Sequence, residues 1–343
     1  MYNRDNFCYS IWGTSYEKVY KSLTKKEYRS FKIPKKGGMR TIHYLERTDP
    51  VFVYQQKLLT RFLEKQPLPV CVKGFRKGES YRSFLAEHIG AKFYMRMDIV
   101  SFFPSIHSSW IRETIAGFLW CKPEEDKEKL LSLICNLVTL DDALPQGACT
   151  SPAVSNLVMA RLDQRITKYC QVFNVRYTRY ADDLLFSSQD FDFSNSRWFI
   201  KKMQTILNTR HLKVNFSKLQ FGEMEFALNG YVISDSSIRL SRSRLSDIWR
   251  VLKFAVLNCT LLRQNKKNDF LNNANQLQLK HRDLTKQPFV NGFQFSQYLC
   301  GYRSFLISMV DVNASDTYFQ KSLKKLIVKI EKTINTLDDS GLL

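Results

Sequence analysis

Hydrophobic and polar positions follow two different periods along this chain. Residues 51–66 carry apolar side chains at helical spacing, which predicts a helix that packs against a core. Residues 173–180 and 184–188 are instead short runs rich in aromatic, β-branched and leucine residues, on either side of the polar break Ala181-Asp182-Asp183. Two such runs around a tight break predict a β-hairpin with carboxylates at its tip.

The same patterns predict an α+β chain. Residues 93–106 indicate a strand that enters a turn and then a helix, and residues 33–42 indicate a hairpin around a Lys-Lys-Gly-Gly turn. Helices are also expected over 106–140, 153–169, 199–211 and from about 241 onward, and a second hairpin over 225–233. The last third, residues 236–343, holds 17 Lys and Arg against 8 Asp and Glu, and we expect it to be a separate helical domain.

The charge balance favours a polyanionic partner. Lys and Arg number 52 against 32 Asp and Glu, a net charge of +20, and nucleic acid is the commonest partner of so basic a chain. An acidic membrane surface is the competing interpretation, but no apolar run reaches the roughly 20 residues that a membrane span needs. We therefore expect no membrane partner.

Cysteine usage and the N-terminal sequence favour a cytoplasmic protein. The eight cysteines lie far apart, without Cys-x-x-Cys or paired Cys/His spacing, which argues against a zinc site and against a disulfide framework. The first residues lack the charged-then-apolar profile of a signal peptide. We expect reduced thiols and a cytoplasmic location.

The candidate chemistry centres on three carboxylates. Asp182 and Asp183 repel each other on a hairpin tip unless a cation lies beside them, although Asp is also common in ordinary turns. Asp98 lies inside an apolar strand, where an unpaired carboxylate is costly, so it too needs a metal or another cation as partner. Oxygen ligands of this kind suit Mg²⁺ or Mn²⁺.

Other candidate side chains each have a simpler alternative. The turn with Lys35, Lys36 and Arg40 can meet phosphate oxygens, or it is merely solvated. Phe103 follows Asp98 by five residues, close enough to form part of the wall of the same site, but a single Phe is more often a core residue. Gln146, in a loop that contains Gly and Pro, either faces a substrate or is simply exposed.

Five segments in a fixed order carry a family resemblance. They are the basic Gly-Gly turn, Asp98 with Phe103, Leu-Pro-Gln-Gly…Ser-Pro at 144–152, Tyr-Ala-Asp-Asp at 180–183, and Lys218 followed by Leu-Asn-Gly-Tyr. This order resembles a reverse transcriptase over roughly residues 33–235, and within that family the chain is most similar to the compact prokaryotic enzymes of the retron type. Phe-Phe-Pro-Ser-Ile at 102–106 and Gly-Tyr-Arg-Ser-Phe at 301–305 add to that likeness.

Two blocks depart from the retron pattern. Retron enzymes usually carry Asn-Ala-x-x-His before the first catalytic Asp, whereas here only the His is kept, as His88, and a lone His is more often structural. They tend to carry Val-Thr-Gly in the primer-grip hairpin, where this chain has Leu228-Asn229-Gly230. The related phage-defence and abortive-infection reverse transcriptases are the alternative that the resemblance leaves open.

The resemblance implies a right-hand polymerase fold in three parts. Fingers with an N-terminal extension are expected over residues 1–92. The palm is expected over residues 93–235, with inserted fingers helices at about 107–143. A basic helical thumb over residues 236–343 would hold the template–primer duplex by its phosphates.

The resemblance also implies roles for the site residues. Asp98, Asp182 and Asp183, with the Ile99 carbonyl assisting, would hold two Mg²⁺ ions, and Mn²⁺ is the alternative metal. Lys218 resembles a lysine proposed to protonate the leaving pyrophosphate. The remaining candidates would bind the nucleotide: Lys35 or Lys36 with Arg40 at the triphosphate, Phe103 against a 2′-OH so that DNA is the product, and Gln146 in the pocket wall.

The implied activity is that of an RNA-directed DNA polymerase that copies a structured non-coding RNA into single-stranded DNA, in a retron-type anti-phage defence system. Its partners would be the RNA template, the RNA–DNA duplex, dNTP substrates and an effector protein of the same system. A group II intron or other mobile-element reverse transcriptase is the second interpretation. The third is an RNA-binding scaffold that keeps the polymerase fold.

Overall fold

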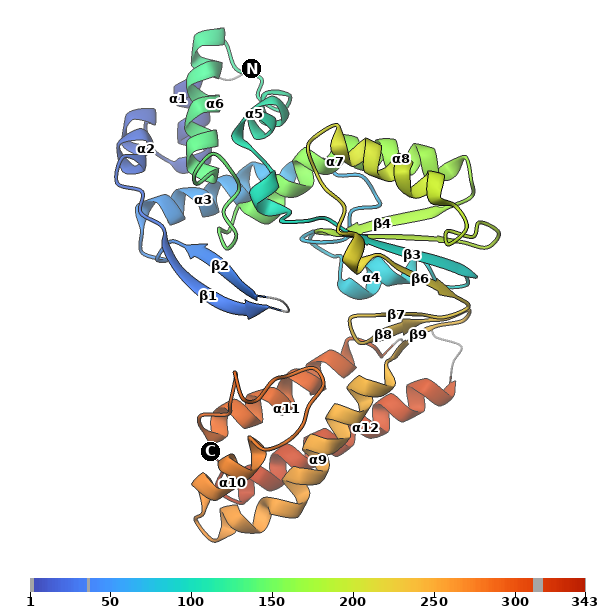
Figure 1. Cartoon of the computed structure of the whole chain (residues 1–343). Helices are drawn as coiled ribbons and strands as arrows, with labels where there is room; N and C mark the ends of the chain where they lie inside the picture. Colours follow the sequence, from blue (N-terminus) through green and yellow to red (C-terminus); the bar gives the residue numbers. More distant parts are fainter. Residues whose placement is uncertain (1–2, 36–37, 311–316, 343) are drawn as a thin grey trace. The chain divides into compact units, whose positions relative to one another are not determined.

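The computed structural model describes residues 3–35, 38–310 and 317–342, and the chain divides into two compact units, Met1–Glu223 and Met224–Leu343 (Figure 1). The helices of the first unit are α1 (Arg4–Trp12), α2 (Tyr16–Leu23), α3 (Pro50–Arg61), α4 (Tyr81–Ala86), α5 (Ser108–Ala116), α6 (Glu124–Val138), α7 (Ser151–Gln171) and α8 (Arg197–Asn208). Its strands are β1 (Arg29–Lys35), β2 (Gly38–Tyr44), β3 (Phe93–Asp98), β4 (Arg176–Tyr180), β5 (Asp183–Ser188) and β6 (Gln220–Glu223). The second unit contains β7 (Phe226–Leu228), β8 (Tyr231–Ile233), β9 (Ile238–Leu240), α9 (Arg242–Arg263), α10 (Lys267–Ala274), α11 (Gly292–Ile307) and α12 (Thr317–Asp339).

A four-stranded antiparallel sheet organises the first unit. Its strand order is β4-β5-β3-β6, and β5 is buried along its whole length between two neighbours. Helices α7 and α8 cover one face of this sheet, while β1 and β2 form a separate two-stranded hairpin (Figure 1). The mixture of helices and antiparallel strands confirms the predicted α+β class.

Local side chains explain where several helices begin. Asp49 precedes α3 and accepts a hydrogen bond from the Val51 N–H at 2.7 Å, and Pro50 occupies the first turn, where its missing N–H costs nothing. At the start of α4, Ser80 and Ser83 each accept from the other's backbone N–H. These caps fix where α3 and α4 begin, and α4 packs against β4 of the sheet.

Two features differ from the sequence pattern. The helical stretch expected over 106–140 is divided into α5 and α6, because Gly117 and Pro123 interrupt it. The hairpin expected over 225–233 is present, with Asn229 and Gly230 both at positive φ in its turn, and a third strand, β9, extends it. Strand β9 has only three residues, too short an alternation to be recognised without a turn of its own such as Asn229-Gly230.

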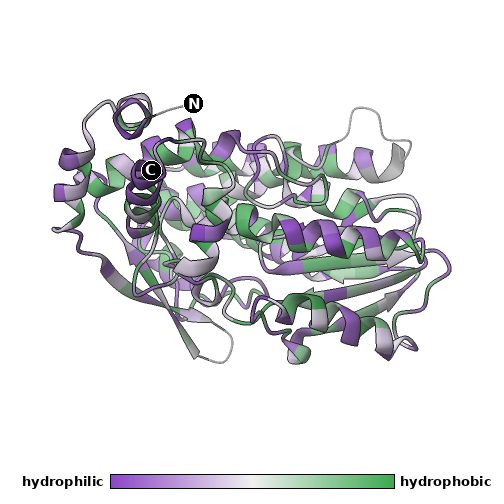
Figure 2. Ribbon diagram, turned by 90° about the horizontal axis from the view of Figure 1, so that it is seen from above, coloured by the Kyte–Doolittle hydropathy of each residue, from purple (hydrophilic) through white to green (hydrophobic). Residues whose placement is uncertain are grey.

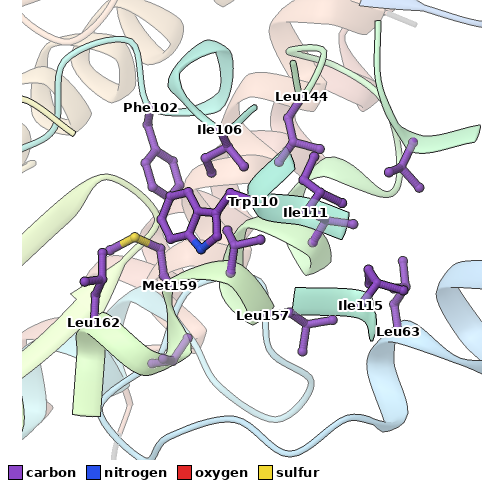
Figure 3. Packing of buried hydrophobic residues seen from close by; sticks show 14 of the residues in the cluster. Leu63, Phe102, Ile106, Trp110, Ile111, Ile115, Leu144, Leu157, Met159 and Leu162 are labelled. Carbon is purple, nitrogen blue, oxygen red and sulfur yellow. The ribbon is translucent and has the colours of Figure 1, made fainter. Parts of the chain in front are cut away.

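Part of the core of the first unit lies between α7 and the segment that follows β3. Phe102, Ile106 and Trp110 lie with Met159 and Leu162 of α7, and all five are buried (Figure 3). In Figure 2 single helices carry both hydrophobic and hydrophilic residues, as expected for elements with one buried and one exposed face. This packing fixes the chain just beyond the end of β3.

The second unit is built from helices around its own core. Helix α9 packs against α10 and α12, and α11 packs against α12. The buried carboxylate of Asp247 accepts hydrogen bonds from the backbone N–H groups of Lys280 and His281, at 3.0 and 2.9 Å, which ties the long loop after α10 to α9. None of the helices in the described parts of the chain is long and apolar enough to cross a membrane.

A fully buried ion pair joins α7 to the sheet. The Asp163 carboxylate accepts from Arg179 Nε at 2.9 Å, from Arg179 Nη2 at 2.8 Å and from the Tyr177 hydroxyl at 2.8 Å. Neither charged side chain is exposed to solvent. Removal of either side chain is therefore expected to destabilise the fold, because the remaining charge would be buried without a partner.

We expect Asp163→Ala to lower the free energy of unfolding by about 3–5 kcal/mol, since it leaves Arg179 buried without its partner. Glu46→Ala is the matched control, because Glu46 pairs with Arg29 in an exposed position and its loss should cost less than about 1 kcal/mol. Urea unfolding followed by tryptophan fluorescence measures both. Equal losses in the two variants would contradict this reading of the buried pair.

Candidate active site

The predicted central hairpin is present, and its loop is only two residues long. Tyr180 pairs with Asp183 across β4 and β5, which leaves Ala181 and Asp182 as the loop. Ala181 adopts a φ of 56°, in the left-handed region that residues with a Cβ rarely occupy. The buried Arg179 donates from Nη1 to the Ala181 carbonyl oxygen at 3.1 Å and so holds this conformation.

The register of the sheet brings Asp98 to the same turn. Asp98 is the last residue of β3 and lies directly opposite Asp183 of β5. The next N–H along the chain, that of Ile99, donates to the Asp182 carbonyl oxygen at 3.1 Å, and the Asp98 carbonyl oxygen accepts from the Asn215 N–H at 2.8 Å. Backbone pairing alone therefore brings the three predicted aspartates together.

Two cations lie against these carboxylates. Lys218 Nζ is 2.8 Å from Asp98 Oδ2, which places this half-exposed predicted residue beside the site. Arg96, two residues before Asp98 on β3, donates from Nε to Asp183 Oδ1 at 2.9 Å and also through Nη2. The same Nη2 is 3.9 Å from Asp98 Oδ2. The site thus carries two fixed positive charges of its own.

These cations do not fully balance the negative charge. Burial raises the pKa of Asp183 to about 6, and the repulsion from Asp182 and Asp98 adds to it, although Arg96 acts in the opposite direction. Burial also raises the pKa of Asp182, again with a contribution from Asp98. Lys218 and Arg40 only partly offset that effect. The cluster is short of positive charge.

A divalent metal ion fits this donor set. Within residues 3–35, 38–310 and 317–342, no three His, Cys, Asp or Glu side chains are already gathered around one metal position. The ligands on offer are buried and half-buried carboxylate oxygens, and burial together with the neighbouring carboxylates raises the pKa values of Asp182 and Asp183. Hard cations such as Mg²⁺ prefer carboxylate oxygens as ligands. Asp98, whose Oδ2 contacts Lys218, and Asp182 are placed to hold it, and Asp183 is engaged by Arg96 through Oδ1.

Of the predicted nucleotide-binding residues, Arg40 is close enough to the cluster to act electrostatically on the Asp182 carboxylate. Phe103 is half-buried in a short 3₁₀ turn, with its ring centroid 5.4 Å from that of Phe102. The Gln146 carbonyl oxygen accepts from the His43 N–H of β2 at 2.7 Å, which ties the Gln146 loop to the strand that carries the exposed Arg40.

Only glycine fits beside Gln146. Gly147 has a φ of 118°, and a Cβ there would lie 2.5 Å from the His43 carbonyl oxygen. Lys35 ends β1, while Lys36 lies outside the described residues. The phosphate-binding assignment of these two lysines and the part of the Ile99 carbonyl in metal binding stay predictions.

Sequence reasoning missed Arg96 and treated His88 as structural. An available signal for Arg96 was its position two residues before Asp98 on one strand, since such residues share a face of the sheet. His88 is fully buried between the Ser187 and Thr178 hydroxyls, each 2.7 Å from a ring nitrogen, and burial lowers its pKa to about 3. It is an uncharged packing residue.

Comparison with known families identifies this arrangement. Residues 33–237, which include every strand and carboxylate of the site, match the sequence profile described as reverse transcriptase (RNA-dependent DNA polymerase). The chain belongs to this reverse transcriptase family. Its right-hand polymerase fold, expected from the motifs, is thereby confirmed.

The most similar relatives include retron reverse transcriptases, as the motifs predicted. The retron Mx65 enzyme of Myxococcus xanthus is 30% identical over 178 residues, 48% of this chain and 41% of the relative. The retron Ec86 enzyme of Escherichia coli is 29% identical over 227 residues, 64% of this chain and 68% of the relative. The retron Ec73 enzyme of Escherichia coli is 34% identical over 163 residues, 45% of this chain and 51% of the relative. The chain thus spans less than two thirds of two of these relatives.

The raised pKa of Asp183 predicts a pH-dependent stability. Between the usual pKa of an aspartate and a pKa of about 6, the folded state binds more protons than the unfolded state, so this group makes stability fall as the pH rises. We expect Asp183→Asn to remove that loss. Relative to the unsubstituted protein, the variant should gain at least about 1 kcal/mol between about pH 5 and about pH 7.5.

Urea unfolding in EDTA at the two pH values measures this gain. Asp190→Asn, which alters an exposed carboxylate on the loop after β5, is the matched control and should show no such change. An advantage of Asp183→Asn that is the same at both pH values would show that the carboxylate is not destabilised by its surroundings.

Proposed function

We propose that this protein is an RNA-directed DNA polymerase that copies a structured non-coding RNA into single-stranded DNA, as part of a retron-type system. The observation that carries the proposal is the β3–β5 register, which sets Asp98 opposite Asp183 and next to Asp182 in a chain of the reverse transcriptase family. The retron relatives support the choice of template class.

Asp98 and Asp182 are proposed as the ligands of two divalent metal ions, Mg²⁺ or Mn²⁺. When bound, the ions would supply the positive charge that makes the primer hydroxyl a better nucleophile and stabilises the leaving pyrophosphate. Asp183 contributes negative charge beside them while its carboxylate is held by Arg96. Two ligands and a nearby charged group leave room for the oxygens of substrate and water that Mg²⁺ retains.

Lys218 is proposed as the proton donor to the leaving group. Its ammonium is beside Asp98 at 2.8 Å and half-exposed, so it remains accessible to a bound triphosphate while its charge stays near the carboxylates. A hydrogen bond from an ammonium to a phosphate oxygen is stronger than one between neutral groups.

The nucleotide is proposed to lie between the aspartate turn and β2. The Arg40 guanidinium is close enough to Asp182 to offset part of the rise in the pKa of that carboxyl, and Lys35 ends the first strand of the same hairpin. Lys36, the next residue in the sequence, is proposed to act with Lys35. Phe103 is proposed to stand against the sugar, where a ring excludes a 2′-OH by its volume. Gln146 is proposed to line the pocket, through a loop that β2 already holds.

The parts of the chain are proposed to serve as fingers (1–92), palm (93–235, with inserted helices at about 107–143) and thumb (236–343). The basic thumb would bind the phosphates of the RNA–DNA duplex, an interaction that weakens steeply with salt. We further propose that the DNA product serves anti-phage defence together with an effector protein, in the cytoplasm.

Primer extension on an RNA template with dNTPs and Mg²⁺ tests the activity. We expect Asp98→Asn and Asp182→Asn each to lower the rate by roughly 1,000-fold or more, because a bound metal contributes several kcal/mol to transition-state stabilisation. EDTA should abolish the reaction and added Mg²⁺ should restore it.

Asp190→Asn is again the matched control and should retain the full rate, since Asp190 lies in an exposed loop. A chain that extends no primer under any metal condition, or one whose Asp98→Asn variant keeps its rate, would exclude the proposed chemistry.

A further inference from the structure

Phe75 is an exposed aromatic residue in an unfavourable backbone conformation. Its side chain is 46% exposed, and its φ is 56°. A bulky residue in the left-handed region is uncommon, and such strain persists only where the surrounding structure enforces it. Burial of the ring does not offset the cost of this backbone conformation, because almost half of the side chain remains exposed to solvent. This combination indicates a role other than packing in the core.

The loop that ends in Phe75 is fastened to the aspartate hairpin. Val72 forms a parallel bridge with Arg179 of β4, and the N–H groups of Lys73 and Gly74 donate to the Arg179 carbonyl oxygen at 2.9 and 3.3 Å. The buried Asn156 donates from Nδ2 to the Gly74 carbonyl oxygen at 2.8 Å. Together these contacts fix the backbone immediately before Phe75.

Gly74 brings this loop unusually close to the turn. A Cβ at Gly74 would lie 2.7 Å from the Ala181 nitrogen and 3.0 Å from the Tyr180 Cα, so no other residue fits without displacing that backbone. The position of Phe75 is therefore set by the same turn that carries Asp182.

The Phe75 ring contacts two aromatic side chains on the segments that carry the carboxylates. Its centroid is 6.3 Å from that of Phe103, tilted by 45°, and 6.1 Å from that of Tyr180, tilted by 41°. Phe103 also contacts the buried Phe102, at a centroid distance of 5.4 Å. Phe103 thus contacts one ring that the core fixes and one that the strained loop fixes.

We propose that Phe75 is a positioning residue that sets sugar specificity through Phe103. This inference rests on the proposed function, in which Phe103 excludes the 2′-OH of a ribonucleoside triphosphate. Exclusion of a single oxygen requires a ring that cannot rotate away, and Phe75 is the neighbour that blocks this rotation. The substrate class it selects is the deoxyribonucleoside triphosphates.

The test is the ratio of kcat/KM for a dNTP to that for the matching rNTP, on one RNA template–primer. We expect Phe75→Ala to lower this ratio about tenfold, mainly through better use of the rNTP, while kcat for the dNTP stays within about threefold. Phe75→Tyr keeps the ring and should keep the ratio. Phe75→Leu, a second variant that retains apolar bulk, should lie between them.

Phe221→Ala is the matched control, because Phe221 is 42% exposed on β6, a similar exposure, and should leave the ratio unchanged. The double variant Phe75→Ala/Phe103→Ala should discriminate no less than Phe103→Ala alone, since Phe75 acts only through Phe103. A merely structural role for Phe75 would shift thermal stability without changing the ratio.

An unchanged ratio in an active Phe75→Ala or Phe75→Leu protein would overturn the inference and leave the polymerase intact. An additive loss in the double variant would equally overturn it, since Phe75 would then act independently of Phe103. Failure of the unsubstituted protein to incorporate any dNTP would instead overturn the proposed function, and this inference with it.

Discussion

The cost of burying three carboxylates together is the constraint on which the site depends. The antiparallel register of β3 and β5 alone brings the three carboxylates together. It fixes Asp98 opposite Asp183 and places Asp182 in the adjoining loop. Arg96 and Lys218 offset part of that charge, yet the pKa values of Asp182 and Asp183 stay raised. We therefore propose that this site binds divalent cations and, through them, phosphate.

Holding the loop in place requires a second buried charge system behind it. Ala181 takes a left-handed conformation that its own Cβ disfavours, and the Asp163–Arg179 pair supplies the hydrogen bond that keeps it there. The backbone of Gly74 packs directly against the backbone of this turn, at a distance that leaves no space for a side chain. A buried ion pair contributes little net stability, so its value here is better understood as fixing one geometry at the turn.

Sequence reasoning reached the fold class, the hairpin and the family because each depends on local pattern or on the order of motifs. The aspartate turn at 180–183 is local, and so is the strand before Asp98. Arg96 escaped notice because its partner, Asp183, is brought to it only by strand pairing. Phe75 was equally hidden, since neither its positive φ nor its contact with Phe103 follows from a Gly-Phe-Arg-Lys-Gly stretch that reads as an ordinary loop.

The most direct test of the account is to purify the protein from cells that carry its native flanking sequence and to sequence the nucleic acid bound to it. The Asp182→Ala/Asp183→Ala protein, prepared in the same way, is the control. The account predicts a defined RNA joined to complementary DNA from the unsubstituted protein, and the RNA without DNA from the control. Defined RNA without DNA from both proteins, even after dNTPs and Mg²⁺ are added, would contradict it and favour an RNA-binding scaffold.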